Sequence, residues 1–303
     1  MSHAIGRCVL SLHLNALGLG IRLEAPPAAL HELERDWSRC VSGPIDPGDE
    51  VCLSLGDQDA SRRDHLRYVL TTEITSRAIA HLSGEHLLFH ACGLSDPDGR
   101  VAALIGGTTA GKSTAAMVLG RTSFGYVTDE VVAVNEAAHV LPFPRPIALE
   151  RGGGELGGKV QRGPDELQLR RCPPVMSLHR LVLLERRIEP HGSPELKQVP
   201  AADAIIEIVP QTSALAALDR PLQRLCALIE RSGGVFRLIY DDIGDTADIL
   251  RELLASDQRR SIDWAPTDGS PSVTNADAGV GRGRVERSAV ADAVVVDDAL
   301  IVL

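Results

Sequence analysis

Aromatic residues and lysine are scarce in this chain. Of its 303 residues, 3% are aromatic, and the only lysines are Lys112, Lys159 and Lys197. With so few rings available, the core must be built from Leu, Val, Ile and Ala. Charged residues make up 24% and apolar residues 44%, which is ordinary globular usage and excludes a wholly disordered chain. The length suits one large domain or two modest ones.

Positive charge is outnumbered by negative charge, and the formal net charge is −10. This balance argues against broad electrostatic binding to nucleic acid or to anionic membranes, but it leaves room for a local phosphate pocket. The sequence also lacks a signal-peptide pattern and any apolar run of about eighteen residues. We therefore expect a soluble, cytoplasmic protein.

The six cysteines have no C-x-x-C spacing, and no neighbouring His completes a zinc pattern. A chain of this length can bury a sizeable core without disulfides. We therefore interpret the cysteines as reduced, buried small hydrophobic residues.

Apolar patterning and turn residues divide the chain into four segments. Residues 1–75 are predicted to form a small β-rich segment with one helix near 28–38, and residues 76–257 to form an α/β domain. Residues 258–283 have the composition of a linker. Residues 284–303 end in a strand–turn–strand pattern, which predicts a C-terminal hairpin.

Within the second segment, short apolar runs alternate with amphipathic stretches. The expected strands cover residues 101–106, 125–128, 131–135, 181–185 and 235–240. The expected helices cover residues 113–119, 201–209, 221–231 and 246–254, and residues 74–90 fit a helix that runs into a strand. The Pro- and Gly-rich stretch 141–175 is predicted to be an irregular loop.

The most informative motif lies between the strand 101–106 and the helix that follows it. Residues 106–113, GGTTAGKS, fit G-x-x-x-x-G-K-[ST], the phosphate-binding loop, which this composition would produce by chance roughly a few times in a thousand chains. Glycines let backbone N–H groups converge on a phosphate, the lysine reaches the β- and γ-phosphates, and the hydroxyl takes one Mg²⁺ position. A glycine-rich helix cap is the alternative. The predicted nucleotide-binding residues are Gly106, Gly107, Thr108, Thr109, Ala110, Gly111, Lys112, Ser113 and Thr114.

Two acids, Asp129 and Glu130, stand at the end of the predicted strand 125–128. A strand-end acid beside a phosphate loop can hold Mg²⁺ or accept a proton from an attacking hydroxyl, although solvated turn acids have the same pattern. His90 lies between apolar residues and fits a core histidine as well as a catalytic one. The candidate catalytic residues are Asp129, Lys112 and His90.

For the other charged residues we prefer a structural role over a role in binding. Arg145, Arg151 and Lys159 could clamp a phosphate, but loop positions favour solvated charges. Asp241 and Asp242 look like a metal pair, yet they also fit the turn and cap of the helix near residue 246.

The segment from His90 to Val134 resembles the catalytic domain of the HPr serine kinase/phosphorylase family. The resemblance extends over roughly residues 76–257 and implies a P-loop α/β fold related to nucleotide-dependent phosphoenolpyruvate carboxykinases. It implies Asp129 as general base, and Ser113 with Glu130 as Mg²⁺ ligands. Thr109 stands where the family usually has glycine, and the pair is Asp-Glu rather than Asp-Asp.

The C-terminal residues 284–303 look like the opening hairpin of a PqqD-like peptide-binding domain. Taken together, these patterns favour a kinase that uses ATP and Mg²⁺ to phosphorylate a hydroxyl, expected to be a Ser of a peptide or protein, in a peptide natural-product pathway. Two alternatives stay open, a nucleotide-gated binding or scaffold protein and a small-molecule kinase. The family resemblance also leaves a homo-oligomer open.

Overall fold

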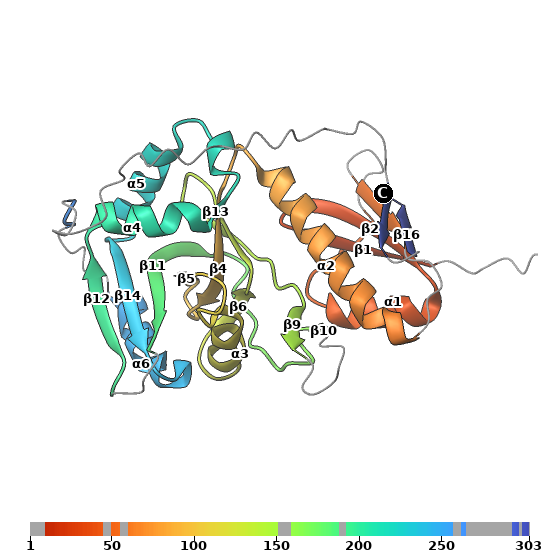
Figure 1. The fold of residues 1–303 in the computed structure, drawn as a ribbon, viewed down its shortest axis with the longest axis horizontal. Helices are drawn as coiled ribbons and strands as arrows, with labels where there is room; N and C mark the ends of the chain where they lie inside the picture. The colour runs from red at the N-terminus through yellow and green to blue at the C-terminus, as the bar shows by residue number, and fades with distance from the viewer. Residues whose placement is uncertain are drawn as a thin grey trace, which may run out of the picture.

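The computed structural model describes residues 10–44, 50–54, 60–150, 159–187, 192–256, 262–264, 293–296 and 299–302. Within these ranges the chain is a mixed α/β protein, as expected from the alternation of apolar runs and amphipathic stretches. Figure 1 shows a larger sheet with helices on both faces, beside a smaller N-terminal unit.

The larger sheet has nine strands. They are β4 (Leu87–Ser95), β5 (Arg100–Ile105), β6 (Gly125–Thr128), β7 (Val131–Val134), β8 (Val140–Leu141), β11 (Ser177–Arg186), β12 (Glu195–Val199), β13 (Thr212–Ser213) and β14 (Val235–Tyr240). Their order is β12-β14-β11-β5-β4-β7-β8, and β6 and β13 also pair with β4. The central strands β5, β11 and β14 are parallel, whereas β4 runs antiparallel to β5.

Four helices cover this sheet, namely α3 (Lys112–Thr122), α4 (Ala201–Ile208), α5 (Pro221–Arg231) and α6 (Ala247–Ala255). Helices α4 and α5 pack on one face, and α3 and α6 pack on the other. Each face of the sheet has its own apolar core. In β5, Ile105 packs in the core beneath α4 and α5, and Leu104 packs in the core beneath α3 and α6. Because β5 is buried on both faces from Val101 onward, residues 101–105 are continuously apolar, and that run makes the strand predictable. Short 3₁₀ turns at Val209–Gln211, Leu215–Ala217 and Ile243–Thr246 complete the helical segments.

The N-terminal unit contains β1 (Leu10–Ala16), β2 (Leu19–Ala25), β3 (Glu50–Ser54), α1 (Pro27–Asp36) and α2 (Ala60–Leu82). Strand β2 pairs antiparallel with β1 and parallel with β3, so the expected β-rich segment is present. The position 75, where we expected this segment to end, lies inside α2, which continues to Leu82. Helix α2 also starts well before residue 74, where the sequence first indicated a helix.

One apolar core joins the N-terminal unit to the larger sheet. Trp37 and Ile74 of the unit are fully buried in the same cluster as Val131 and Phe143. The rings of Trp37 and Phe143 lie 6.2 Å apart between centroids. The two parts therefore cannot separate without exposing buried apolar surface.

Two sequence expectations need correction. The stretch 141–175 is not wholly irregular, because β9 (Ile147–Glu150) and β10 (Lys159–Arg162) form an antiparallel pair within it. Strand β12 was missed, since its sequence ELKQV is largely polar, as befits a strand at the sheet edge.

Other expectations concern the C-terminal region and the cysteines. The hairpin is present as β15 (Ala293–Val296) and β16 (Ala299–Val302), which pair antiparallel. The predicted linker 258–283 lies outside the described residues, apart from 262–264, and so does Cys8. In the part of the chain that the structure covers, Cys40 and Cys92 are buried free thiols, as expected, whereas Cys172 and Cys226 are free but only partly buried.

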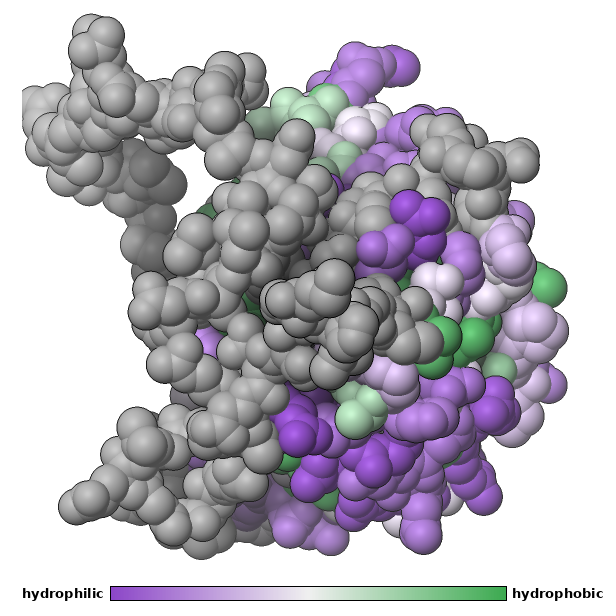
Figure 2. Space-filling view, turned by 90° about the vertical axis from the view of Figure 1, so that its right-hand side faces the viewer, coloured by the Kyte–Doolittle hydropathy of each residue, from purple (hydrophilic) through white to green (hydrophobic). Residues whose placement is uncertain are grey.

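Figure 2 shows how polar and apolar residues are distributed over one face of the molecule. In the view of Figure 2, hydrophilic residues predominate and hydrophobic residues form small scattered patches. Among the described helices, none combines the length and the apolar content that crossing a bilayer requires.

Replacing Phe143 by Ala should lower the free energy of unfolding by about 3–5 kcal/mol, because it removes a fully buried ring from the core shared by both units. Urea unfolding followed by circular dichroism measures this loss and should still show one transition. Val175→Ala is the control, since Val175 is 76% exposed and its loss should change stability by less than about 0.5 kcal/mol. A loss below about 1 kcal/mol for Phe143→Ala would contradict the shared core.

Candidate functional site

The glycine-rich loop, residues 106–111, connects the end of β5 to the start of α3. Its two outer glycines are required by space. A Cβ on Gly106 would lie 2.6 Å from Cβ of Ala110, and a Cβ on Gly111 would lie 2.6 Å from the hydroxyl of Tyr240. Gly111 also has φ +91°, in the left-handed region that glycine adopts at no steric cost. The two fixed glycines of the motif are therefore the two that this tight turn needs.

Thr109 has φ +73°. A β-branched residue in the left-handed region is a steric outlier, because its Cβ crowds the following carbonyl oxygen. The sequence analysis singled out this position, because the family that the chain resembles usually has glycine there. The backbone at this position therefore has a conformation that glycine favours, although the residue there is a threonine.

Tyr240, at the end of β14, braces this loop from a strand that is distant in sequence. Its hydroxyl donates to the carbonyl of Ala110 at 2.7 Å. Burial raises the pKa of Tyr240, so the hydroxyl keeps its proton for this bond. The sequence analysis missed Tyr240, because only the parallel arrangement of β5, β11 and β14 brings it to the loop.

Lys112 is the first residue of α3, and it is buried. Its Nζ donates to the carbonyl oxygens of Gly106 at 2.5 Å and Gly107 at 3.0 Å. Burial lowers the pKa of Lys112, while the nearby carboxylates of Glu130 and Asp129 act in the opposite direction. The ammonium group therefore lies against the first two residues of the loop. The motif requires a cation beside the loop, to contact the phosphates.

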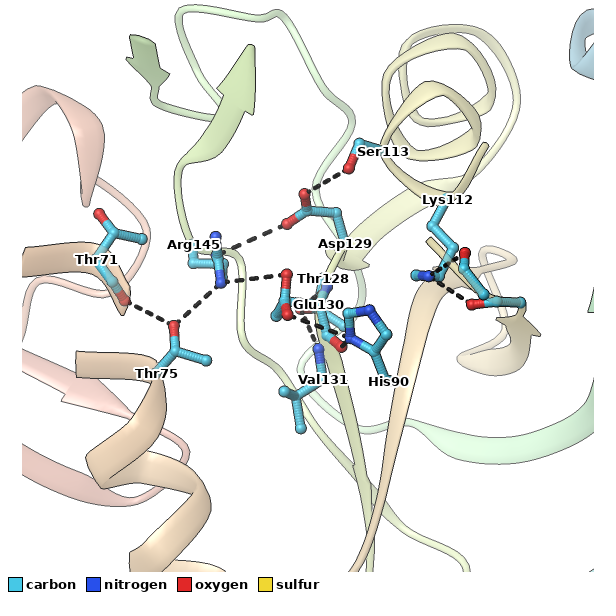
Figure 3. Close-up of polar contacts among 12 residues, drawn as sticks. Thr71, Thr75, His90, Lys112, Ser113, Thr128, Asp129, Glu130, Val131 and Arg145 are labelled. Atoms are coloured by element: carbon cyan, nitrogen blue, oxygen red, sulfur yellow. Dashed lines mark hydrogen bonds and ion pairs between the residues drawn. The ribbon is translucent and has the colours of Figure 1, made fainter. Parts of the chain in front are cut away.

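The turn between β6 and β7 presents Asp129 and Glu130. Thr128 organises this turn, because its Oγ1 accepts from the backbone N–H groups of Glu130 at 3.2 Å and Val131 at 3.4 Å. Figure 3 shows Asp129 facing Ser113 at the start of α3, and Glu130 between His90 and Arg145. The sequence prediction that these two acids lie beside the loop is consistent with this placement.

Asp129 is only 4% exposed. Its Oδ2 accepts from the Ser113 hydroxyl at 3.2 Å, and its Oδ1 lies 3.1 Å from the hydroxyl of Tyr126. Burial raises the pKa of Asp129, an effect that Arg145 opposes and Glu130 reinforces. A buried carboxylate with a raised pKa is a better proton acceptor than an exposed one.

Glu130 has both carboxylate oxygens engaged. Oε1 lies 3.2 Å from Nδ1 of His90, and Oε2 lies 3.6 Å from Nη1 of Arg145. Burial acts to raise the pKa of Glu130, but the His90 contact and the Arg145 charge outweigh it, so the pKa is lowered. His90 is therefore held beside the acidic turn instead of being buried alone in the core, and it lies opposite Val131 in the β4–β7 pairing.

Arg145 corrects the sequence interpretation. We expected a solvated loop charge, but Arg145 is 6% exposed and lies between the two carboxylates and α2. Its Nε is 3.8 Å from Asp129 Oδ1, and its Nη1 donates to Oγ1 of Thr75 at 3.1 Å. Lys159 is exposed on β10, with Nζ 5.4 Å from the centre of the Tyr68 ring, and Arg151 lies outside the described residues.

Asp241 and Asp242 behave as the preferred interpretation expected. Asp242 Oδ1 accepts from the backbone N–H of Gly244 at 2.8 Å and so caps the turn before α6. Asp241 instead contacts Arg187 at 3.2 Å. The two carboxylates therefore have different partners in this structure.

A small hollow of about 110 Å³ opens beside the loop. Ligand pockets usually measure about 300–1,000 Å³, so this hollow would enclose only part of a nucleotide. It is lined by Gly111, Thr114, Arg186, Tyr240, Asp241, Asp242 and Ile243. Gly111 and Thr114 are the predicted nucleotide-binding residues in this lining.

Mg²⁺ prefers hard oxygen ligands and usually keeps several waters while it binds one or two carboxylates and substrate phosphates. The hydroxyl of Ser113 offers such an oxygen at the start of α3, and the Asp129 carboxylate lies 3.2 Å from it in the turn between β6 and β7. Within the described ranges, no cluster of three or more His, Cys, Asp or Glu side chains could hold a metal by itself. The residues present thus fit an ion that shares its coordination with phosphates.

Comparison with models of known protein families and with curated proteins finds no match for this chain. The assignment of the site therefore rests on the geometry described above. The sequence analysis missed four residues that contribute contacts to the site, namely Tyr126, Tyr240, Thr75 and Thr128. All four are buried side chains that carry a hydroxyl group, and no local signal in the sequence marks them, because burial and pairing are tertiary properties.

Replacing Thr109 by Gly should raise the free energy of unfolding by about 0.5–1 kcal/mol. Relief of about 1–2 kcal/mol of left-handed strain exceeds the added backbone entropy of glycine, which costs about 0.5–1 kcal/mol. Thr108→Gly is a matched control, because Thr108 is also exposed but has no positive φ, and it should be destabilising. Thermal unfolding measures both variants. If both shift stability in the same direction, the strain at Thr109 is refuted.

Proposed function

We propose that this protein is a kinase that uses ATP and Mg²⁺ to phosphorylate a hydroxyl group, expected to be a Ser side chain of a peptide or protein. The observation that carries the proposal is the buried Asp129 carboxylate, whose Oδ2 lies 3.2 Å from Ser113 at the start of α3. A proton acceptor beside a phosphate-binding loop is the arrangement that phosphoryl transfer to a hydroxyl requires. The resemblance to the HPr serine kinase/phosphorylase family supports the same reaction.

The glycine-rich loop would bind the phosphates of ATP. Its backbone N–H groups and the positive end of the α3 dipole attract anionic oxygens. Lys112, which bridges the carbonyls of Gly106 and Gly107, would exchange these neutral partners for the β- and γ-phosphates. A phosphate oxygen carries a full negative charge, whereas a carbonyl oxygen carries only a partial one, so the exchange favours the bound nucleotide.

Asp129 would act as the general base. The acceptor oxygen attacks the γ-phosphorus while the bond from that phosphorus to the bridging oxygen of ADP breaks, and the hydroxyl proton passes to the Asp129 carboxylate. The raised pKa of Asp129 brings its basicity closer to that of the proton donor. Tyr126 holds the carboxylate through Oδ1 and leaves Oδ2 toward the start of α3.

Ser113 would hold Mg²⁺ together with phosphate oxygens and water. When bound, the ion neutralises charge on the β- and γ-phosphate oxygens. Glu130, which the family resemblance implies as the second ligand, contacts His90 and Arg145 with its two oxygens. Its lowered pKa keeps it ionised, so it would contribute negative charge near the ion while His90 and Arg145 fix its orientation.

Transfer of label from [γ-³²P]ATP to peptides tests this proposal directly. The wild-type protein with Mg²⁺ should label a mixture of Ser-centred peptides and leave the matching Ala-centred mixture unlabelled. Asp129→Asn should keep ATP binding but transfer label about 10²–10⁴-fold more slowly, because the amide cannot accept the proton. Asp165→Asn is the control, since Asp165 pairs with Arg39 and lies outside the site.

Two outcomes contradict the account in different ways. Wild-type transfer by Asp129→Asn would show that Asp129 is not the base. ATP binding by the wild-type protein without labelling of any Ser, Thr or Tyr peptide would refute the protein-kinase proposal.

A further inference from the structure

We propose that Arg145 is a positioning residue of this site, and that helix α2 of the N-terminal unit holds it in place through Thr75. The inference rests on the proposed phosphotransfer function and extends it, because it makes the N-terminal unit a working part of the site.

Arg145 contacts both acids of the turn at once. Its Nε lies 3.8 Å from Asp129 Oδ1, and its Nη1 lies 3.6 Å from Glu130 Oε2. The planar guanidinium group has donors in a fixed fork, so it can face two carboxylates in a defined relative orientation. At 6% exposure this cation is shielded from water, and the two carboxylates are the anions that compensate its charge.

The two oxygens of each carboxylate face different partners. Asp129 turns Oδ1 toward Arg145 and Oδ2 toward Ser113, while Glu130 turns Oε2 toward Arg145 and Oε1 toward His90. Adjacent carboxylates repel each other, and without a cation between them their side chains would rotate apart. Arg145 thereby fixes the rotation that points Asp129 at the start of α3.

Thr75 anchors the guanidinium from the other side, as Figure 3 shows. Its hydroxyl accepts from Arg145 Nη1 at 3.1 Å and donates to the carbonyl of Thr71 at 2.8 Å, so donor and acceptor are both used. The neighbouring Ile74 is fully buried in the core shared with Val131, which fixes α2 relative to the acidic turn.

The main chain of Arg145 is held at the same place. Its N–H donates to the carbonyl of Phe143 at 2.8 Å, and its own carbonyl lies 3.0 Å from the hydroxyl of Tyr126. Tyr126 is also the partner of Asp129 Oδ1. The backbone of Arg145, through Tyr126, and its side chain therefore both help to hold Asp129 in place. An isolated surface charge would make no such set of contacts.

Thr75→Val tests the anchor with little change of shape. In the peptide-labelling assay we expect kcat to fall about tenfold, with KM for ATP and the calorimetric Kd for Mg²⁺–ATP within about twofold of wild type, because orientation is lost while nucleotide binding is kept. Thr72→Val is the matched control. Thr72 lies on the same helix and makes the same kind of bond, Oγ1 to the carbonyl of Tyr68 at 3.0 Å, but is exposed, and its variant should match wild type.

Arg145→Met and Arg145→Lys provide a second test. Met removes both charge and fork, and kcat should fall by about 10²-fold; Lys restores the charge alone and should recover only part of that loss. If Arg145→Met fails to fold, the comparison of kcat between Thr75→Val and Thr72→Val still tests the positioning role.

The outcomes separate this inference from the proposed function. An active wild type with equal kcat for Thr75→Val and Thr72→Val would overturn the positioning role alone. A parallel loss of kcat and nucleotide affinity in Thr75→Val would also overturn it, because it would assign Arg145 to nucleotide binding. An inactive wild type would overturn the proposed function, and the positioning role with it.

Discussion

The balance of charge among Asp129, Glu130 and Arg145 is the constraint on which the rest of the site depends. Two adjacent carboxylates, one of them almost fully buried, are held beside a loop that is suited to bind further negative charge. Such a pair is costly unless a cation and hydrogen-bond donors compensate it. Arg145 provides the charge, and Tyr126 and His90 provide bonds on the remaining sides.

The same three charges lie where the N-terminal unit meets the larger sheet. The guanidinium of Arg145 reaches Thr75 on α2, and the apolar cluster around Trp37 and Phe143 keeps α2 against the sheet. The loop on the other side of Asp129 is braced separately, by Tyr240 from the end of β14. Elements far apart in sequence thus meet at one turn, so fold and site cannot be understood independently.

The parts of the molecule that can be predicted well from the sequence are those specified by local chemistry. The apolar run of β5 and the glycine spacing of the loop are sufficient to locate a strand, a turn and a helix. Arg145 is misread from the sequence because burial and pairing are tertiary properties, which a Pro-rich sequence context does not reveal. Strand β12 is missed for a related reason, since an edge strand needs no apolar pattern.

We propose that the glycine-rich loop binds the phosphates of a nucleotide. Isothermal titration calorimetry of Mg²⁺–ATP into the folded wild-type protein, repeated at two temperatures so that an accidental zero enthalpy is recognised, measures this most directly. The account predicts saturable binding at one site per chain, weakened at least about tenfold in Lys112→Ala, since one charge-assisted contact is worth about 1.5–3 kcal/mol. Absence of heat at both temperatures from correctly folded wild-type protein would contradict it.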